Sequence, residues 1–232
     1  MSEAFSPLSA ALSLVFSGDQ ALGEIVLLSL KVSLTAVFIA SIIALPIGAT
    51  LAIYRFPGHG IIVAVLNSLM GLPPVVLGLI VYLLLSRAGP LGQYGLLFTP
   101  EAMIIAQTFL VLPIIAALSR QTLADLHGQY QEQFRSYRLG AVSSILTLLW
   151  EGRFSLVTAI LAGFGRASAE VGAVMIVGGN INHVTRLMTT TIAMETSKGD
   201  FSLALGLGIV LVFIIVMVNM LAALIQGLER RA

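Results

Sequence analysis

Long apolar runs, separated by short polar segments, dominate this chain. Five of the runs are long enough, or nearly long enough, to cross a bilayer, which takes about 20 mostly apolar residues in a helix. They lie at residues 25–54, 61–86, 102–119, 154–178 and 202–226. The pattern predicts an all-α, polytopic membrane protein with about five transmembrane helices.

The segment before the first run has a different pattern. Its apolar residues recur at roughly helical spacing between Phe5 and Phe16, and the pattern breaks at residues 17–19. No Lys or Arg precedes Lys31, whereas a cleaved signal peptide begins with basic residues. We therefore predict an N-terminal interfacial amphipathic segment at 1–24, and a single transmembrane domain at 25–232.

Composition supports a membrane protein and excludes several other classes. Hydrophobic residues make up 58% of the chain and charged residues 10%, and the mean hydropathy is +1.01. A net charge of +1 gives no indication of nucleic acid, and the absence of cysteine excludes disulfides. The chain also lacks the G-x-x-x-x-G-K-[ST] phosphate loop, so we expect no ATP hydrolysis by this chain, and its three scattered histidines indicate no metal site.

Basic residues indicate the orientation in the membrane. With the N-terminus outside, five crossings leave seven arginines in inside segments and three basic residues in outside loops, which satisfies the positive-inside rule. The inside set is Arg55, Arg120, Arg135, Arg138, Arg153, Arg230 and Arg231, and the outside set is Arg87, Arg186 and Lys198. We predict an outside N-terminus and a cytoplasmic C-terminus.

The inside segment at 120–153 is the longest of the polar connections. Apolar residues recur in it at helical spacing on both sides of Leu139 and Gly140. This pattern predicts two short helices that meet near Gly140 on the membrane surface.

The second apolar run contains Gly71, Pro73 and Pro74 near its middle. Proline removes an amide hydrogen and clashes with the preceding turn, so this pair predicts a kinked or unwound helix. Broken backbone at membrane depth is tolerated where it faces protein or a water-filled cavity. The break is therefore either a pathway element or a purely architectural kink.

The fourth run contains two charged residues, Arg166 and Glu170. On one continuous helix they would lie about one turn apart on the same face and could pair, which lowers the cost of burying each charge. Small residues at four-residue spacing beside them predict close contact with another helix. The pair could be an internal packing element or could line a pathway, with Arg166 attracting an anion.

Two stretches carry a resemblance to a known family. The segment "EQFRSYRLGAVSSILTLLWEGRFSLVTAILAGFGRASAEVGA" resembles the signature loop of binding-protein-dependent ABC importer permeases, with Gly140 at the signature glycine. The combination of "LMGLPPVVLGLIVYLLLSRAGPLG" with "GFGRASAEVGAVMIVGGNI" is similar to the tungstate permease subfamily, relatives of molybdate and sulfate permeases. The resemblance covers the chain from about residue 25 onward.

The resemblance implies a type I ABC importer permease fold and a set of partners. A homodimer would form the pathway in a prokaryotic inner membrane, an external binding protein would deliver a tungstate-like oxyanion, and two cytoplasmic ATPase subunits would dock on 120–153. The chain itself would bind no cofactor, since the ATPase would hold ATP and magnesium. The implied coupling residues are Glu132, Arg138, Leu139, Gly140 and Ala141.

The same resemblance implies roles for the pathway candidates. Arg166 would attract the oxyanion, and Gly178, Gly179 and Asn180 would present backbone amides at the mouth of the pathway. Molybdate or sulfate remains an alternative substrate. A proton-driven secondary transporter with Glu170 as its titrating group, and a purely structural subunit, are alternatives of other classes.

Overall fold

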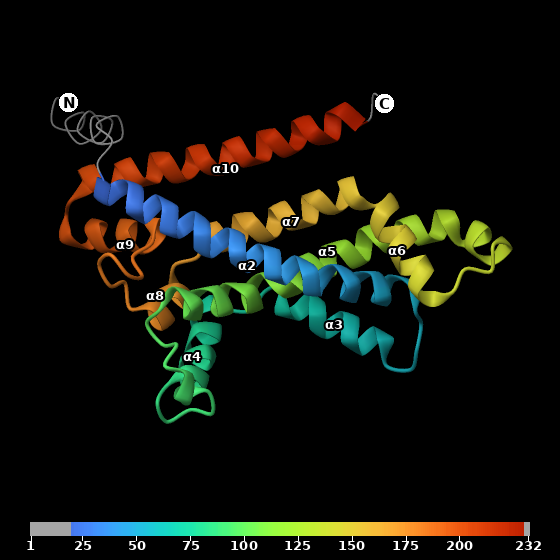
Figure 1. Ribbon diagram of the computed structural model, residues 1–232, viewed down its shortest axis with the longest axis horizontal. Coiled ribbons are helices and arrows are strands. Elements are labelled where there is room, and N and C mark those ends of the chain that lie inside the picture. The colour runs from blue at the N-terminus through green and yellow to red at the C-terminus, as the bar shows by residue number, and fades with distance from the viewer. Residues whose placement is uncertain (1–19, 230–232) are drawn as a thin grey trace. The chain divides into compact units, whose positions relative to one another are not determined.

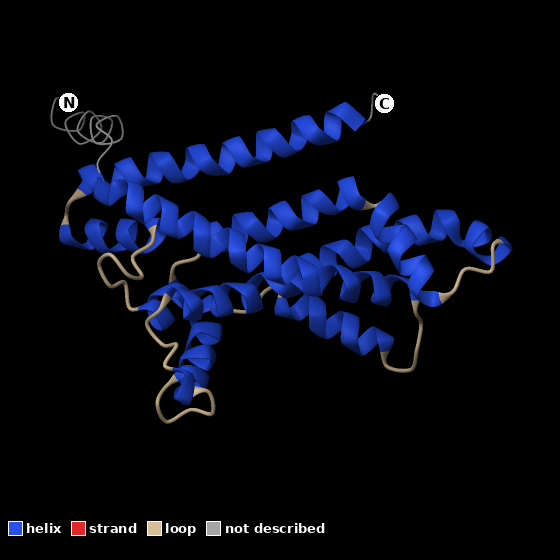
Figure 2. Cartoon of the chain, in the orientation of Figure 1, coloured by secondary structure: helices blue, strands red, loops and turns tan. Residues whose placement is uncertain are grey.

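The computed structural model of the protein describes residues 20–229, and their regular structure is helical throughout, without a strand among them (Figure 2). The N-terminal amphipathic segment predicted at 1–24 lies largely outside the described residues, and residues 20–24 begin the first described helix. The elements are α2 (Gln20–Ile53), α3 (His59–Leu69), α4 (Pro74–Leu85), the 3-10 helix η1 (Gly92–Tyr94), α5 (Pro100–Ser136), α6 (Ala141–Glu151), α7 (Arg153–Ser168), α8 (Gly172–Gly178), α9 (Met188–Lys198) and α10 (Phe201–Glu229).

Three of these helices, α2, α5 and α10, are long and apolar enough to cross a membrane. Two bent pairs, α3 with α4 and α6 with α7, raise the number of candidate spans to five if each pair forms one span. Length and composition thus confirm the predicted polytopic all-α membrane protein.

The chain divides into two compact units. The first contains residues 1–35, 74–107 and 168–232, and the second contains residues 36–73 and 108–167. Because α2 and α5 each contribute to both units, neither unit is a continuous stretch of chain.

In the first unit, α4 and α8 pack closely because small residues lie at their contact (Figure 1). A methyl group added to Gly78 would lie 2.7 Å from Cα of Ala173, and one added to Gly172 would lie 2.7 Å from Cγ2 of Val75. Only glycine therefore fits at these two positions without a shift of the neighbouring atoms.

A second contact of the same unit joins α9 to α10 and to the beginning of α2. Met188, Leu207 and Ile214 form its buried centre, and apolar residues of α2 such as Ile25 pack against them. The amide of Met188 also donates a hydrogen bond to Oγ of Ser29, at 2.8 Å. The beginning of α9 is thus tied to α2 by both apolar and polar contacts.

The second unit contains α3, α6, most of α7 and the later parts of α2 and α5. Its buried cluster consists of Ala49, Ala52, Leu123, Phe134, Leu148 and Leu156. Close approach again depends on glycine, because a methyl group on Gly48 would overlap Oγ of Ser119 and one on Gly163 would lie 2.7 Å from Cδ1 of Ile115. The segment 120–153 is therefore packed on the helices that lead to it.

The third apolar run does not end where its hydropathy falls. We expected a helix near 102–119 followed by a separate short helix, but α5 continues without interruption to Ser136. No glycine or proline follows Pro113 until Gly128, and alanine, leucine, Arg120 and Gln121 in between are good helix formers, so the backbone hydrogen bonding continues. Only the second of the two expected short helices is separate, and it is α6.

The fourth run is not one helix, which corrects the prediction of a span at 154–178. The helix α7 ends at Ser168, and α8 begins at Gly172 and ends at Gly178. The expected outside loop after it contains a further helix, α9. Gly172 and Gly165 weaken a continuous helix here, and side chains from elsewhere satisfy the freed backbone groups, as described below.

The second run is interrupted as the two prolines predicted. The helix α3 ends at Leu69 and α4 begins at Pro74, so residues 70–73 lie outside both helices. Proline at the first position of α4 loses nothing, because the first amides of a helix have no intrahelical acceptor.

Candidate functional site

Residues 169–171, which separate α7 from α8 and are called the Glu170 break here, hold a buried carboxylate. The side chain of Glu170 is 2% exposed, and its Oε1 accepts a hydrogen bond of 3.0 Å from the amide of Ala173. The hydroxyl of Thr189 donates a hydrogen bond of 2.7 Å to the carbonyl oxygen of Glu170. Side-chain hydrogen bonds thus satisfy a backbone amide and a backbone carbonyl at the interruption and stabilise it.

The beginnings of α4 and α8 meet at this carboxylate. A methyl group on Gly172 would lie 3.7 Å from Oε1 of Glu170 and 3.8 Å from the backbone nitrogen of Val75, the second residue of α4. Both helix N-termini carry partial positive charge, which stabilises a nearby anion. The arrangement explains how an apolar segment accommodates a glutamate.

Arg166 lies on α7, in its last turn, and is partly buried. The prediction that Arg166 and Glu170 share one helical face was wrong, because the helix ends at Ser168 and Glu170 is outside it. A cation in the last turn of a helix is stabilised by the carbonyl end of the helix dipole. Arg166 is thus placed at the end of α7, and Glu170 in the interruption that follows it.

The candidates of the second run lie on either side of a unit boundary. Pro74 belongs to the first unit, at the start of α4, whereas Gly71 and Pro73 belong to the second. A methyl group on Gly71 would meet only the carbonyl oxygen of Ser68, at an ordinary 3.6 Å. Within the first unit, the structure brings Pro74 close to the Glu170 break, through Val75.

The Gly178–Asn180 turn ends α8 and is tightly packed. Gly179 has φ of +71°, and its amide donates to the carbonyl oxygen of Met175. A methyl group on Gly178 would lie 2.6 Å from Sδ of Met103. The side-chain oxygen of Asn180 accepts a hydrogen bond of 2.8 Å from Thr190. The amide of Gly179 is therefore used within the turn, which is anchored to α9.

The expected coupling residues surround the beginning of α6. Glu132 lies on α5, and Arg138 has φ of +51°, in the left-handed region. Gly140 caps α6 with φ of −71° and ψ of 166°, and a methyl group on it would meet no atom within 4 Å. Ala141 is the first residue of α6. Neither backbone conformation nor space inside this chain requires a glycine at 140.

The surface of α6 is apolar on its outer side. Val142, Leu146 and Trp150, spaced four residues apart, are exposed, whereas Leu148 on the other side is fully buried. The guanidinium of Arg153 lies 4.6 Å from the centre of the Trp150 ring. We call these three exposed residues the α6 strip. Exposed apolar side chains of this kind face either lipid or a partner protein.

Sequence reasoning missed three features of these sites. Thr189 was hidden in the expected loop, the contact of Gly78 with Ala173 joins residues far apart in the chain, and the outward direction of the α6 strip depends on what packs behind it. The four-residue spacing of small residues in the fourth run was the available signal for the second of these, and it did not name the partner helix.

Comparison with known proteins gives close relatives over nearly the whole chain. The chain is 40% identical over 207 residues to a probable anion ABC transporter permease protein of Haloferax volcanii, covering 86% of this chain and 88% of the relative. It is 40% identical over 210 residues to the tungstate uptake system permease protein TupB of Peptoclostridium acidaminophilum (90% and 92% covered), and 36% identical over 215 residues to TupB of Campylobacter jejuni (93% and 90% covered). No family model matches the sequence. Identity at this level across both full lengths shows that the chain belongs to the family of anion ABC transporter permeases that includes the tungstate uptake permeases.

Proposed function

We propose that this chain is the transmembrane permease subunit of an ATP-driven, binding-protein-dependent importer of a tungstate-like oxyanion. The observation that carries the proposal is the 40% identity to a tungstate uptake permease over 90% of the chain. The lack of a phosphate loop agrees with ATP hydrolysis by a separate subunit, which would hold ATP and magnesium.

Two interrupted spans support a translocation role for the described helices. A tetrahedral oxyanion with two charges is attracted by arginine and by amide groups, and it needs no fully dehydrating cage. In this proposal Arg166 supplies the positive potential, and Glu170 keeps the α7–α8 interruption in shape through its bond to Ala173. The Gly178–Asn180 turn contributes a fixed wall near the mouth.

Coupling to ATP hydrolysis is assigned to α6 and the residues before it. The α6 strip presents apolar surface that an ATPase subunit would cover, and Leu139, Gly140 and Ala141 lie directly before it or at its beginning. A glycine at 140 that the chain itself does not require is consistent with close approach of a partner there. Two copies of the chain would form the pathway, and each would engage one ATPase subunit.

The orientation in this proposal places α6 in the cytoplasm of a prokaryotic cell and the N-terminus outside. The extension of α5 beyond its apolar part then lies on the cytoplasmic side, together with Arg120, Arg138 and Arg153. The loops after α4 and α8 face outward, where a binding protein delivers the anion.

Transport by reconstituted proteoliposomes tests the function directly. The wild-type chain, together with its ATPase and binding protein, is expected to take up tungstate only with ATP, and Arg166→Ala is expected to reduce uptake at least about tenfold because one charge-assisted contact is lost. Molybdate and sulfate serve as competitors. Preferential uptake of sulfate, or uptake driven by a proton gradient without ATP, would contradict the proposal.

A further inference from the structure

A cleft of about 280 Å³ lies between the beginning of α2 and the loop that joins α8 to α9. Its polar lining consists of Glu24, Lys31, Asn182, His183 and Arg186, and the rest is mainly the aliphatic surface of α2. We call it the Arg186 cleft. All of its residues belong to the first unit, and it is separate from the Glu170 break.

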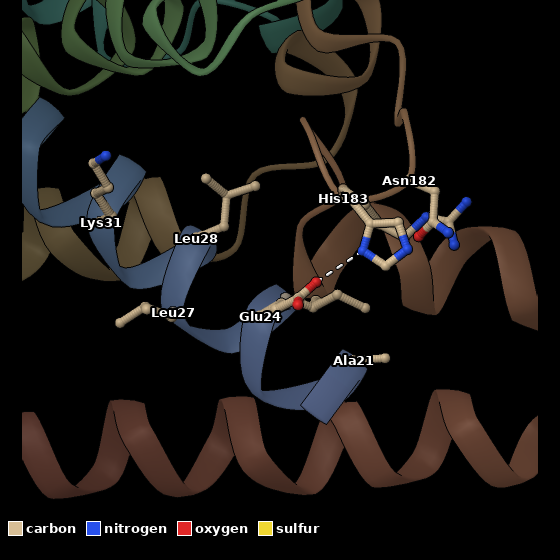
Figure 3. Close-up of a pocket in the computed structure, with 9 residues that line it drawn as sticks. Ala21, Glu24, Leu27, Leu28, Lys31, Asn182 and His183 are labelled. Atoms are coloured by element: carbon tan, nitrogen blue, oxygen red, sulfur yellow. Dashed lines mark hydrogen bonds and ion pairs between the residues drawn. The ribbon is translucent and has the colours of Figure 1, made fainter. Parts of the chain in front are cut away.

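The loop wall of the Arg186 cleft is held in place by hydrogen bonds. Nδ1 of His183 and Oε2 of Glu24 are 2.8 Å apart, and Figure 3 shows the two side chains pointing toward each other. Behind them, the buried hydroxyl of Thr185 donates to the carbonyl oxygen of Gly178 and accepts from the amide of Ile181. His183 itself has φ of +58°. The loop is therefore a fixed surface and presents its side chains in a defined arrangement.

Positive charge predominates among the residues that line the cleft. Among the lining residues Glu24 supplies the one carboxylate, and His183 already binds it, whereas Arg186 forms no ion pair with any residue that the structure describes. Lys31 interacts electrostatically with Glu101, so Arg186 is the principal cation of the cleft. Nε of Arg186 is buried and has no hydrogen-bond acceptor among the described residues. Arg186 also lies just before α9, whose N-terminal end adds partial positive charge.

Arg186 is partly buried and lines the cleft, so a bound anion that contacts the accessible part of its guanidinium would offset the hydration that the charge has lost. Lys31 is seven residues beyond Glu24, or about 10 Å along α2, so it contributes potential more than a direct contact. Figure 3 shows Lys31 well apart from Asn182 and His183. The direct donors are thus the loop residues Asn182 and Arg186, which both line the cleft.

We propose that the loop end of the Arg186 cleft is an oxyanion-binding site, distinct from the Arg166 position, at which a tungstate-like dianion is held before it enters the pathway. The proposal rests on the function and the orientation proposed above, which place this cleft on the outer face. Arg186 and Asn182 donate to the anion, and Lys31 adds attraction. Such a site raises the local concentration of anion at the entrance.

A small anion fits these observations better than an acidic side chain from a protein. A compact tetrahedral anion presents acceptors in several directions at once, so it can meet the two donors, Arg186 and Asn182, that line the cleft. A carboxylate of a partner protein has only two oxygens and is attached to a side chain, so the partner's backbone would also have to fit at the mouth of the cleft. Binding to a protein carboxylate is retained as an outcome of the test.

The experiment measures binding of radiolabelled tungstate to the purified full-length chain by equilibrium dialysis at low ionic strength. Arg186→Gln is expected to weaken saturable binding at least about tenfold, and Asn182→Leu to weaken it to a smaller extent. Lys198→Gln is the matched control, because Lys198 is exposed, is bonded to Glu195 at 3.0 Å and lies outside the cleft. Thermal unfolding of each variant shows that it is folded, and Arg186→Lys, which keeps the charge, should retain intermediate affinity if Arg186→Gln does not fold.

Three results would overturn the site: absence of saturable binding to the wild type, unchanged affinity in Arg186→Gln, or binding that is lost in Arg166→Ala alone. Weaker docking of the binding protein to Arg186→Gln, with unchanged affinity for free tungstate, would also overturn it and assign the cleft to a protein carboxylate. ATP-dependent tungstate uptake by the wild type is measured in parallel. Intact uptake with any of these results leaves the proposed function standing, whereas absent uptake contradicts the function itself.

Discussion

At the scale of single residues, the most informative side chain is Glu170. Its carboxylate is buried, accepts the amide of Ala173 and lies where α4 and α8 begin. Each of these contacts favours an acceptor at this position, and the helix dipoles favour a negative charge. The role of Glu170 as a brace of the interruption therefore differs measurably from the role of a titrating group.

Glu170→Gln separates these two roles. Glutamine keeps an oxygen that accepts the Ala173 amide, so we expect ATP-driven uptake to persist and stability to fall by less than about 1 kcal/mol, whereas Glu170→Ala should cost about 1–2 kcal/mol because the cap is lost. Thermal unfolding in detergent and uptake assays measure both effects. Complete loss of uptake in a stably folded Glu170→Gln would instead favour a proton-carrying Glu170.

At the scale of elements, α6 carries apolar side chains both on the side that packs on its own protein and on the side that is exposed. Leu148 is buried on the inner side, while the α6 strip of Val142, Leu146 and Trp150 is open to the surroundings. In the coupling role proposed above, an ATPase subunit covers this exposed strip.

Two leucines on α6 provide a matched test of that assignment. Leu146, 61% exposed, should tolerate Leu146→Ser with less than about 0.5 kcal/mol of destabilisation, yet the variant should no longer co-purify the ATPase. Leu148, 0% exposed, should lose about 2–5 kcal/mol on Leu148→Ser, because a cavity and a buried hydroxyl are created. Mild-detergent pull-downs measure ATPase binding by both variants, and thermal unfolding measures their stability. An ATPase that remains bound to Leu146→Ser would argue against the α6 strip as the docking surface.

At the scale of the whole molecule, the orientation in the membrane determines which helix ends face the cytoplasm. In the orientation proposed above, the α5–α6 connection lies inside and the α4–α5 connection outside. Tyr137 and Tyr94, one in each connection, are both exposed. The chain contains no cysteine, so a single introduced thiol reports its position without background labelling.

Labelling with a membrane-impermeant maleimide tests this orientation. Tyr94→Cys should react in intact cells, because its connection faces outward, and Tyr137→Cys should react only after the membrane is permeabilised. The unmodified, cysteine-free chain is the control for background. The reverse pattern would invert the topology and move the Arg186 cleft to the cytoplasmic side.

The features that the sequence predicts are those that depend on residues close together in the chain. Hydropathy determined the helical membrane class and approximately where most spans lie, because spanning a bilayer requires local runs of apolar residues. Pro73 and Pro74 determined the interruption between α3 and α4, since proline acts on its own helix turn. The resemblance in the signature loop identified the family that the relatives confirm.

Only the tertiary structure decided the rest. The interruption at Glu170 depends on Thr189 and on the start of α4, which are distant in the chain, so the local pattern favoured a continuous helix instead. The outward direction of the α6 strip depends on the cluster behind Leu148, and the Arg186 cleft exists because the α8–α9 loop is hydrogen-bonded to α2. Local sequence determines which segments are apolar or broken, whereas the partners that satisfy buried polar groups are chosen by long-range packing.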